Sequence, residues 1–437
     1  MSVTSTIRGL TRFDALALTA LIWFLAKFLR YAFPPLFEPL QGAYGVSNTV
    51  IGAAFTGFML VYALMQFPSG LLADRLGSVI VITAGALLAA VAAFVVVLEP
   101  PFAFLVGAMM LMGAGTGAHK TVAIRLLSRT YPARTGRALG VLDTVGTFGG
   151  VAAPAAVVAV ASVPLLFDPG WRTLFFAAGL VGIGLAAAFA IQVPKRLPGE
   201  ASTITEVDAE SGSKTGAGTE TEIETDSVEP AAGNSSAGVQ RYLELFREWR
   251  FSVFVVVTIL FSFTYNGVVA FFPLYLVQEA GLDGTTAGLL YSVLFALSLV
   301  QLVTGEVSDR IGKLPVIVAT QGLATVSLAA FVLLTGTGGP LVLGATIVAV
   351  GIGSHGFRPV RGSYLMSVLP TSIAGGSLGI VRTLLMGAGA ISPTVVGYLS
   401  ETVGFRPAFW LLTASIALAT ALSAVLLVLE PGRTTSE

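Results

Sequence analysis

The sequence predicts an all-α membrane protein with twelve transmembrane helices arranged as two pseudo-symmetric halves. The 437 residues are 55% hydrophobic and only 11% charged, and the mean hydropathy is +0.86. A soluble domain averages about 25% charged residues. Apolar runs of about 20 residues, the length that spans a bilayer, recur along nearly the whole chain. The second half repeats features of the first at a nearly constant offset, which favours a duplicated bundle.

Twelve apolar segments are long enough to cross a membrane, and short segments with turn residues separate them. The predicted spans are residues 14–38, 48–71, 79–98, 102–128, 137–161, 171–193, 251–276, 285–306, 314–335, 340–367, 376–400 and 405–429.

Residues 199–238 are rich in Ser, Thr, Gly, Glu and Asp, which predicts a disordered, acidic linker between the sixth and seventh spans. Residues 242–250, "YLELFREWR", predict a short amphipathic helix at the membrane interface. The predicted organisation is therefore an N-terminal six-helix bundle (1–198), a linker with the interfacial helix (199–250) and a C-terminal six-helix bundle (251–437).

The basic residues outside the spans lie mostly on one side of the predicted membrane, which is the cytoplasmic side by the positive-inside rule. We therefore expect both termini and the linker to be cytoplasmic, in a protein of the cell membrane. The residues on that side are Arg8, Arg12, Arg75, Arg129, Arg134, Arg137, Lys195, Arg196, Arg241, Arg247, Arg250, Arg310 and Lys313, against mainly Arg172 and Arg406 on the other.

Two pairs of segments carry the internal repeat. "QFPSGLLADRLGS" (66–78) corresponds to "QLVTGEVSDRIGK" (301–313), and "GAGTGAHKTVAI" (113–124) corresponds to "GIGSHGFRPVRG" (351–362). Prolines also correspond, at 132 and 370 and at 154 and 393.

On these residues the chain resembles the major facilitator superfamily over essentially its full length. "GLLADRLG" (70–77) is similar to that family's signature between helices 2 and 3, and "GEVSDRIG" (305–312) is a degraded second copy. The first copy departs from the family pattern at Ser78 and Val79, where basic residues are common. The resemblance implies two six-helix bundles around a central cavity, with alternating access to one site at mid-membrane. "RYAFPPLFEPL" (30–40) resembles the helix 1 segment of organic-anion and organophosphate carriers, in which the arginine binds an anionic group.

Four basic residues lie within the predicted spans and are the candidate substrate ligands. Lys27 and Arg30 share one face of the first span, and Lys120 and Arg358 occupy corresponding positions in the fourth and tenth spans. No carboxylate is found at mid-depth, so a negatively charged cargo is the simplest counter-ion. Snorkelling of the long side chains, or bonds to helix carbonyls, are the structural alternatives.

Neighbouring polar residues could complete the site. Asn266 and Tyr62 are further candidate substrate ligands, and each could equally form a helix–helix hydrogen bond. His119 and His355, the only histidines, are candidates for carrying a co-transported proton, since imidazole titrates in the physiological range. Neutral hydrogen bonding is the more common use of such histidines.

A second group of charges is predicted to act as conformational latches, by the family resemblance. Asp74 would meet Arg382 when the cavity is closed on the cytoplasmic side, and Asp309 would meet the start of the fifth span. These latches would be broken in the inward-open state. Asp143 could pair with Arg137 or with Arg310. The predicted latch residues are Asp74, Arg75, Asp309, Arg310, Arg382 and Asp143.

These observations predict a secondary transporter of a small anionic solute, working by exchange with another anion or by proton symport. The nearest alternative is a proton-driven exporter of drugs or hydrophobic compounds, which would need a cavity carboxylate. A membrane receptor and an ion channel fit less well. We find no enzyme constellation and no cysteine, and we expect no metal, no cofactor and no nucleic acid. The expected partners of a monomer are the anionic solute, membrane lipid, and a co-transported proton or counter-anion.

Overall fold

The computed structural model describes residues 13–161, 163, 166–197, 246–368 and 374–430, without the side chains of residues 374–381. Within these residues, twelve helices are long and apolar enough to cross a membrane, which confirms the predicted fold class. The predicted acidic linker lies outside the described residues. The predicted interfacial helix is described only from residue 246, where a turn leads into a span that already begins at Trp249.

Six spans precede the linker and six follow it, and we call these groups the N-terminal half (residues 14–196) and the C-terminal half (249–428). The first half contains α2 (Asp14–Ala32) with η2 (Pro34–Leu36) and α3 (Phe37–Tyr44), α4 (Asn48–Leu76), α5 (Ser78–Val97), α6 (Phe102–Thr130), α7 (Thr135–Ala161) and α8 (Trp171–Gln192). The second half contains α11 (Trp249–Gln278), α12 (Gly284–Ala296) with η5 (Leu297–Leu299) and α13 (Val300–Ile311), α14 (Lys313–Leu334), α15 (Pro340–Val368), α16 (Ala374–Thr402) and α17 (Phe405–Val428).

Local chemistry explains where several helices begin and end. Pro34 and Pro35 lack a backbone N–H, so the first span changes there from α2 to the 3₁₀ turn η2. Gly77 and Gly312, the last residues of the two signature copies, end α4 and α13 with φ values of 86° and 100°. This left-handed region favours glycine and lets the chain turn at once into the next span.

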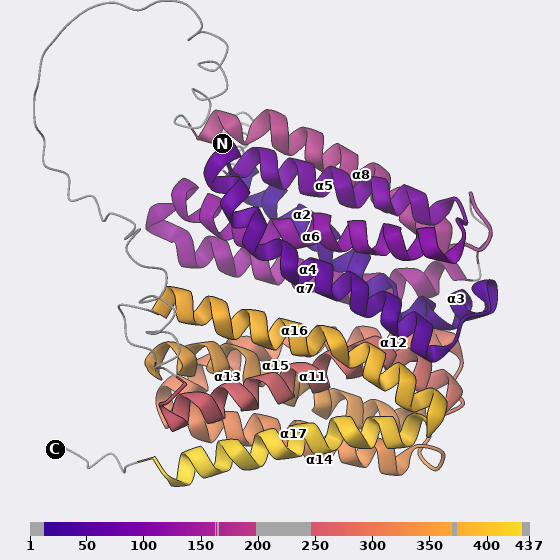
Figure 1. Cartoon of the computed structure of the whole chain (residues 1–437), viewed down its shortest axis with the longest axis vertical. Coiled ribbons are helices and arrows are strands. Elements are labelled where there is room, and N and C mark those ends of the chain that lie inside the picture. Colours follow the sequence, from indigo (N-terminus) through magenta and orange to yellow (C-terminus); the bar gives the residue numbers. More distant parts are fainter. Residues whose placement is uncertain (1–12, 162, 164–165, 198–245, 369–373, 431–437) are drawn as a thin grey trace, which may run out of the picture.

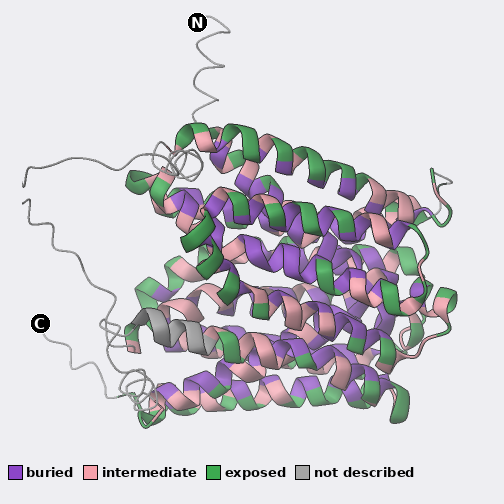
Figure 2. Ribbon diagram, turned by 45° about the horizontal axis from the view of Figure 1, so that its top comes forward, coloured by how far each residue is buried: buried purple, intermediate pink, exposed green. Residues whose placement is uncertain are grey.

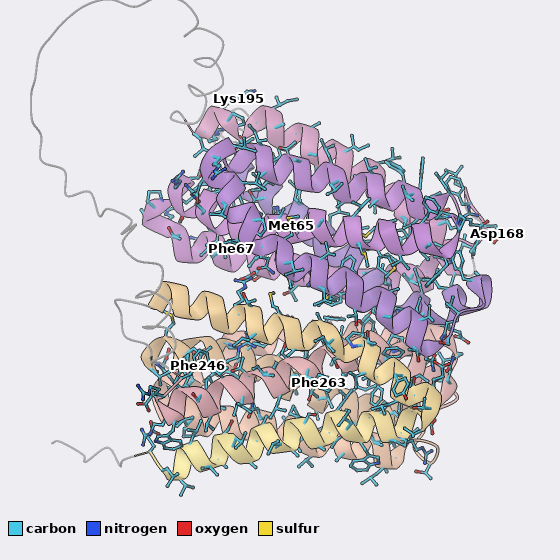
Figure 3. The ribbon with its side chains drawn as sticks, in the orientation of Figure 1. Met65, Phe67, Asp168, Lys195, Phe246 and Phe263 are labelled. Carbon is cyan, nitrogen blue, oxygen red and sulfur yellow. The ribbon has the colours of Figure 1, made fainter. Side chains whose placement is uncertain are left out.

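The two halves form two bundles that lie side by side (Figure 1). Lys195 and Phe246 lie at one end of the molecule and Asp168 lies at the other (Figure 3), and we call these the linker end and the opposite end. Buried side chains fill the interior of each bundle, while exposed ones are distributed over the outer faces (Figure 2). Across the interface α4 packs on α16, and α7 packs on α12.

Direct contacts between the halves are concentrated toward the opposite end. The backbone N–H of Thr49 donates to the Glu401 carboxylate at 3.2 Å, and the hydroxyl of Thr394 donates to that of Thr56 at 2.8 Å. A Cβ added at Gly52 would lie 2.5 Å from the Pro393 carbonyl oxygen, so only glycine permits this approach. Toward the linker end the two bundles diverge (Figure 1).

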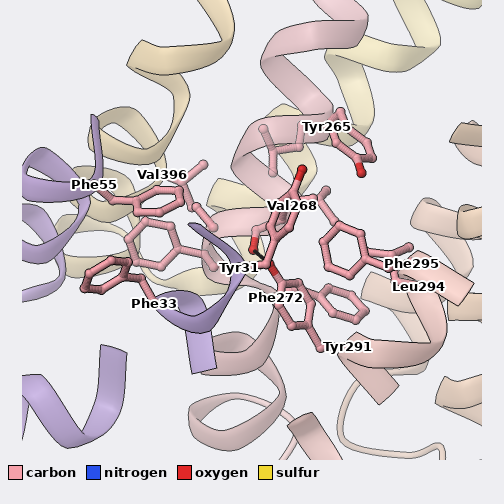
Figure 4. Close-up of a cluster of buried hydrophobic side chains, with 14 of the residues drawn as sticks. Tyr31, Phe33, Phe55, Tyr265, Val268, Phe272, Tyr291, Leu294, Phe295 and Val396 are labelled. Atoms are coloured by element: carbon pink, nitrogen blue, oxygen red, sulfur yellow. Dashed lines mark hydrogen bonds between the residues drawn. The ribbon is translucent and has the colours of Figure 1, made fainter. Parts of the chain in front are cut away.

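An aromatic cluster lies between the halves (Figure 4). The rings of Tyr31 and Phe295 are 4.3 Å apart, and those of Tyr291 and Phe295 are 5.1 Å apart. The Tyr291 hydroxyl donates to the carbonyl of Val269 at 2.8 Å, so this ring is fixed in the C-terminal half. Tyr31 follows Arg30 directly in the chain, so the cluster borders the candidate site described below.

Candidate functional site

Arg30 is the most enclosed of the four predicted cationic ligands, with 7% of its surface exposed. Its guanidinium carbon lies 3.6 Å from the centre of the Tyr62 ring on α4 and 6.0 Å from that of Tyr31. Such stacking stabilises the cation but leaves the edges of the guanidinium available. Among the described residues, Nε and Nη2 of Arg30 have no hydrogen-bond partner.

Lys27 lies one turn before Arg30 and shares an aromatic neighbour with Lys120. The Lys27 Nζ is 5.5 Å from the centre of the Trp23 ring, and the Lys120 Nζ is 5.2 Å from the same ring. Trp23 was not singled out from the sequence. Its four-residue spacing from Lys27, which places both on one helix face, was the available signal.

Arg358 contributes a cation from the C-terminal half to the region that contains Lys27 and Arg30. Its guanidinium carbon lies 4.7 Å from the centre of the Tyr265 ring on α11. Lys27 is close enough to both Arg358 and Arg30 for their charges to interact. The structure therefore brings three predicted ligands, Lys27, Arg30 and Arg358, together at the interface of the halves.

Lys120 differs from the other three cations, because its ammonium forms an ion pair with Asp143. The predicted pairing of Asp143 with Arg137 or with Arg310 is not formed in this conformation. Lys120 precedes the end of α6 by ten residues, and Asp143 follows the start of α7 by eight. At about 1.5 Å per residue, both lie roughly 12–15 Å from the linker end, so the antiparallel helices bring them level.

Lys27, Arg30 and Arg358 have no ion-pair partner among the described carboxylates. An isolated charge in a low-dielectric interior carries a desolvation cost of several kcal/mol, in order of magnitude. An anion that reaches this group of cations would offset part of that cost and would find the free edge of Arg30.

The two histidines have different surroundings. The Nε2 of His119 lies 3.0 Å from the carbonyl oxygen of Thr19 and therefore donates to it, which links α6 to α2. His355 is 1% exposed and contacts the rings of Tyr265 and Phe295 at 5.7 and 6.4 Å. Within the described part of the chain, neither ring nitrogen of His355 has a hydrogen-bond partner.

Asn266 takes part in helix packing. Its Nδ2 donates to the carbonyl of Ser262 one turn earlier, at 2.9 Å. A Cβ at Gly389 of α16 would lie 2.5 Å from the same nitrogen. Gln66 is placed differently, because its Nε2 donates to the Met386 sulfur at 3.2 Å while its buried Oε1 has no partner among the described residues.

The predicted latches are not formed in this conformation. Asp74 forms an ion pair with Arg125 of α6, and Arg310 pairs with Glu306 on its own helix. Asp309 and Arg75 are exposed at the linker end. Since the latches were predicted for the opposite state, closed on this side, their role stays a prediction.

The comparisons with known proteins agree with this architecture. The family model of the Major Facilitator Superfamily matches residues 19–393 and, a second time, residues 295–437. A bacterial homologue of the human lysosomal transporter Spinster has a similar crystal structure, with a TM-score of 0.71, 15% sequence identity and coverage of 97% of this chain and 99% of that one.

Similar sequences include transporters of two kinds. A putative proline/betaine transporter of Staphylococcus haemolyticus is 26% identical over 423 residues, 91% of this chain and 83% of that protein. The chain spans 61% of the length of a Staphylococcus aureus transporter with the same description, at 26% identity over 314 residues, 68% of this chain. A probable chloroplastic anion transporter of Arabidopsis thaliana is 29% identical over 153 residues, 35% of this chain and 29% of that protein.

Proposed function

Because the chain belongs to the Major Facilitator Superfamily and is therefore an integral membrane transporter and not an enzyme, we propose that it moves a small solute of net negative charge. The solute's anionic group would lie among Lys27, Arg30 and Arg358. The linker end would be cytoplasmic, because most basic residues outside the spans lie there. The structure would then represent an inward-facing state, with the halves joined at the opposite end.

The observation that carries the proposal is the unpaired edge of the buried Arg30. The planar face of its guanidinium is covered by the Tyr62 ring, while the buried Nε and Nη2 have no hydrogen-bond partner among the described residues. A carboxylate or phosphate oxygen accepts hydrogen bonds from such an edge in a planar, charge-assisted geometry. Lys27 and Arg358 add two further positive charges within electrostatic range.

The named relatives support a second candidate, a zwitterion that carries a carboxylate, as proline and betaine do. Its carboxylate could bind Arg30 in the same way. Its cationic end would add to an existing excess of positive charge, since the Trp23, Tyr62 and Tyr265 rings already face protein cations. The charge balance therefore favours a net anion over the zwitterion.

A cationic drug is the weakest candidate. Exporters of cations need a carboxylate in the cavity, and the one that contacts the site, Asp143, is already paired with Lys120. Coupling to a proton would depend on His119 or His355, whose Nδ1 atoms each have no hydrogen-bond partner among the described residues.

Thermal stability of the purified full-length protein tests the proposal. Succinate, glycine betaine and choline are matched probes with a net negative, zero and positive charge. A ligand that binds only the folded state at a hundredfold excess over its Kd stabilises it by about 2.7 kcal/mol. We expect succinate to raise the melting temperature most, and Arg30→Gln and Arg358→Gln each to remove most of the shift.

The matched control is Arg247→Gln, which removes a cation outside the spans and should keep the full shift. Stabilisation by glycine betaine alone would overturn the net anion in favour of the zwitterion. A shift with choline alone, or full succinate shifts in both site variants, would overturn the site assignment.

A further inference from the structure

The ion pair between Lys120 and Asp143 introduces a carboxylate at the edge of the proposed anion site. The Asp143 side chain is 61% exposed, whereas that of Lys120 is 13% exposed. The carboxylate therefore approaches an enclosed ammonium from the open side of the interface. If released, it would return to solvent with little desolvation cost.

Asp143 also lies near the unpaired cations. Its charge is within electrostatic range of Lys27, the neighbour of Arg30. Lys27 and Lys120 both lie within 5.5 Å of the Trp23 ring centre, so the two ammonium groups flank one indole. A negative group beside Trp23 can therefore interact with either lysine.

The internal repeat shows that this carboxylate has no counterpart in the C-terminal half. Lys120 lies twelve residues before Pro132, as Arg358 lies twelve residues before Pro370. By the same measure Asp143, eleven residues before Pro154, corresponds to the residue eleven before Pro393, which is Arg382. A cation thus replaces the carboxylate at the repeated position.

The consequence is a difference in charge between corresponding sites. Arg361 is within electrostatic range of both Arg358 and Arg382, so three guanidinium groups gather in the C-terminal half. None of the three forms an ion pair with a carboxylate that the structure describes. The N-terminal half therefore has a carboxylate counter-ion, Asp143, beside the site, whereas the described residues of the C-terminal half provide none for these three arginines.

We propose that Asp143 is an internal occupant of the anion site, which holds Lys120 while the site is empty and yields it to the anionic group of the solute. This inference rests on the proposed function. Lys120 thereby keeps a counter-ion in both the empty and the loaded site. Asp143 also limits which solutes bind tightly, because Lys120, the fourth cation of the site, interacts only with a solute whose anionic group competes successfully with this carboxylate.

Succinate binding to the purified full-length protein, measured by isothermal titration calorimetry, tests the competition. Asp143→Asn removes the competing charge and nearly preserves the shape of an exposed side chain. Since partly exposed ion pairs contribute up to about 1 kcal/mol, we expect roughly fivefold tighter binding. The matched control is Glu306→Gln, because Glu306 is 66% exposed and pairs with Arg310 away from the site. It should leave the Kd unchanged.

Acetylation of Lys120 by acetic anhydride, followed by mass spectrometry, separates the two proposals. We expect faster acetylation in Asp143→Asn than in the wild type without succinate, and slower acetylation in both when succinate is added. Unchanged or weaker succinate binding by Asp143→Asn, or unchanged Lys120 reactivity, would overturn the internal occupant alone. If Asp143→Asn is acetylated faster but neither protein binds succinate, the proposed function is overturned, and so is the replacement of Asp143 by the solute as the partner of Lys120.

Discussion

The two halves of the transporter share one helical plan but differ in how they balance charge. In the N-terminal half, two basic residues of α6 have carboxylate partners, Lys120 with Asp143 and Arg125 with Asp74. Both pairs join neighbouring helices of the same bundle. This half can therefore keep cations near the interface without help from a ligand.

At the positions that correspond to Lys120 and Asp143, the C-terminal half has two cations, Arg358 and Arg382. Arg358 is stacked on Tyr265, and the structure describes no carboxylate partner for Arg358, Arg361 or Arg382. The repeat thus keeps a cation at one pair of corresponding positions, Lys120 on α6 and Arg358 on α15, while the sign of the charge differs between Asp143 on α7 and Arg382 on α16. Under the proposed function, the C-terminal half would depend more on an external anion than the N-terminal half does.

The largest effect is expected when the C-terminal half is given the missing carboxylate. Arg382→Asp places a negative charge near Arg361 at the position that corresponds to Asp143. We expect succinate binding to weaken about tenfold, or by about 1.4 kcal/mol, because the new carboxylate competes for the same guanidinium groups. Isothermal titration calorimetry on the purified variant measures the change.

Arg382→Gln is the matched control, since it removes the cation without adding a competitor. It should weaken binding by less than Arg382→Asp. Equal effects of the two substitutions would show that loss of the arginine alone matters, and the contrast in charge balance between the halves would then have no bearing on affinity.

The halves also differ in what the Cβ of a substituted glycine would meet at one repeated pair, Gly113 and Gly351. A Cβ at Gly113 would lie 2.5 Å from the backbone carbonyl oxygen of Phe58, whereas one at Gly351 would first meet the Cδ1 of Leu297, at 2.6 Å. A leucine methyl group can rotate away, but a helix backbone cannot. Overpacking costs about 1–3 kcal/mol, against a gain of about 1 kcal/mol in helix propensity on replacing glycine with alanine.

We therefore expect Gly113→Ala to lower the free energy of unfolding by up to about 2 kcal/mol and Gly351→Ala to change it little. Thermal unfolding of the two purified variants in the same detergent measures the difference. A lower melting temperature for Gly351→Ala than for Gly113→Ala would contradict the distinction between backbone and side-chain contact.

Sequence patterns predicted the spans well because hydrophobic length and turn residues are local properties. The predicted span 102–128 became α6 at 102–130, and the predicted span 405–429 became α17 at 405–428. The grouping of Lys27 with Arg30 was also available, since both lie on one helix. The pairing of Lys120 with Asp143 was not, because it depends on the rotation and depth of two separate helices.

Trp23, Tyr31 and Phe295 were missed for a related reason. Aromatic residues are common in membrane spans, and only their packing distinguishes a ring that carries a cation or closes the interface from one that faces lipid. Tyr62 was predicted as a ligand of the solute, whereas the structure places its ring under Arg30.

The smallest expected effect concerns the residues that cap the second span of each half. Ser47 accepts a hydrogen bond from the backbone N–H of Val50 at the start of α4, and Asp283 accepts one from Thr286 at the start of α12. The bonds from Thr286 hold the pKa of the Asp283 carboxyl below its ordinary value of 3.8. A carboxylate with a depressed pKa in the folded state stabilises the protein above its ordinary pKa, and this contribution is lost as the pH falls through the folded-state pKa.

We therefore expect Asp283→Ser to lower the melting temperature slightly at pH 7 and to have a smaller effect at pH 3, below the ordinary pKa, relative to the wild type at each pH. The reciprocal change, Ser47→Asp, should give the N-terminal half the same dependence, with slight stabilisation at pH 7 that is smaller at pH 3. Both caps lie at helix N-termini, where the partial positive charge of the helix favours a carboxylate over a hydroxyl. A melting-temperature difference for Asp283→Ser that is the same at both pH values would show that the cap acts through its shape and not its charge, and the two halves would then be equivalent at this position.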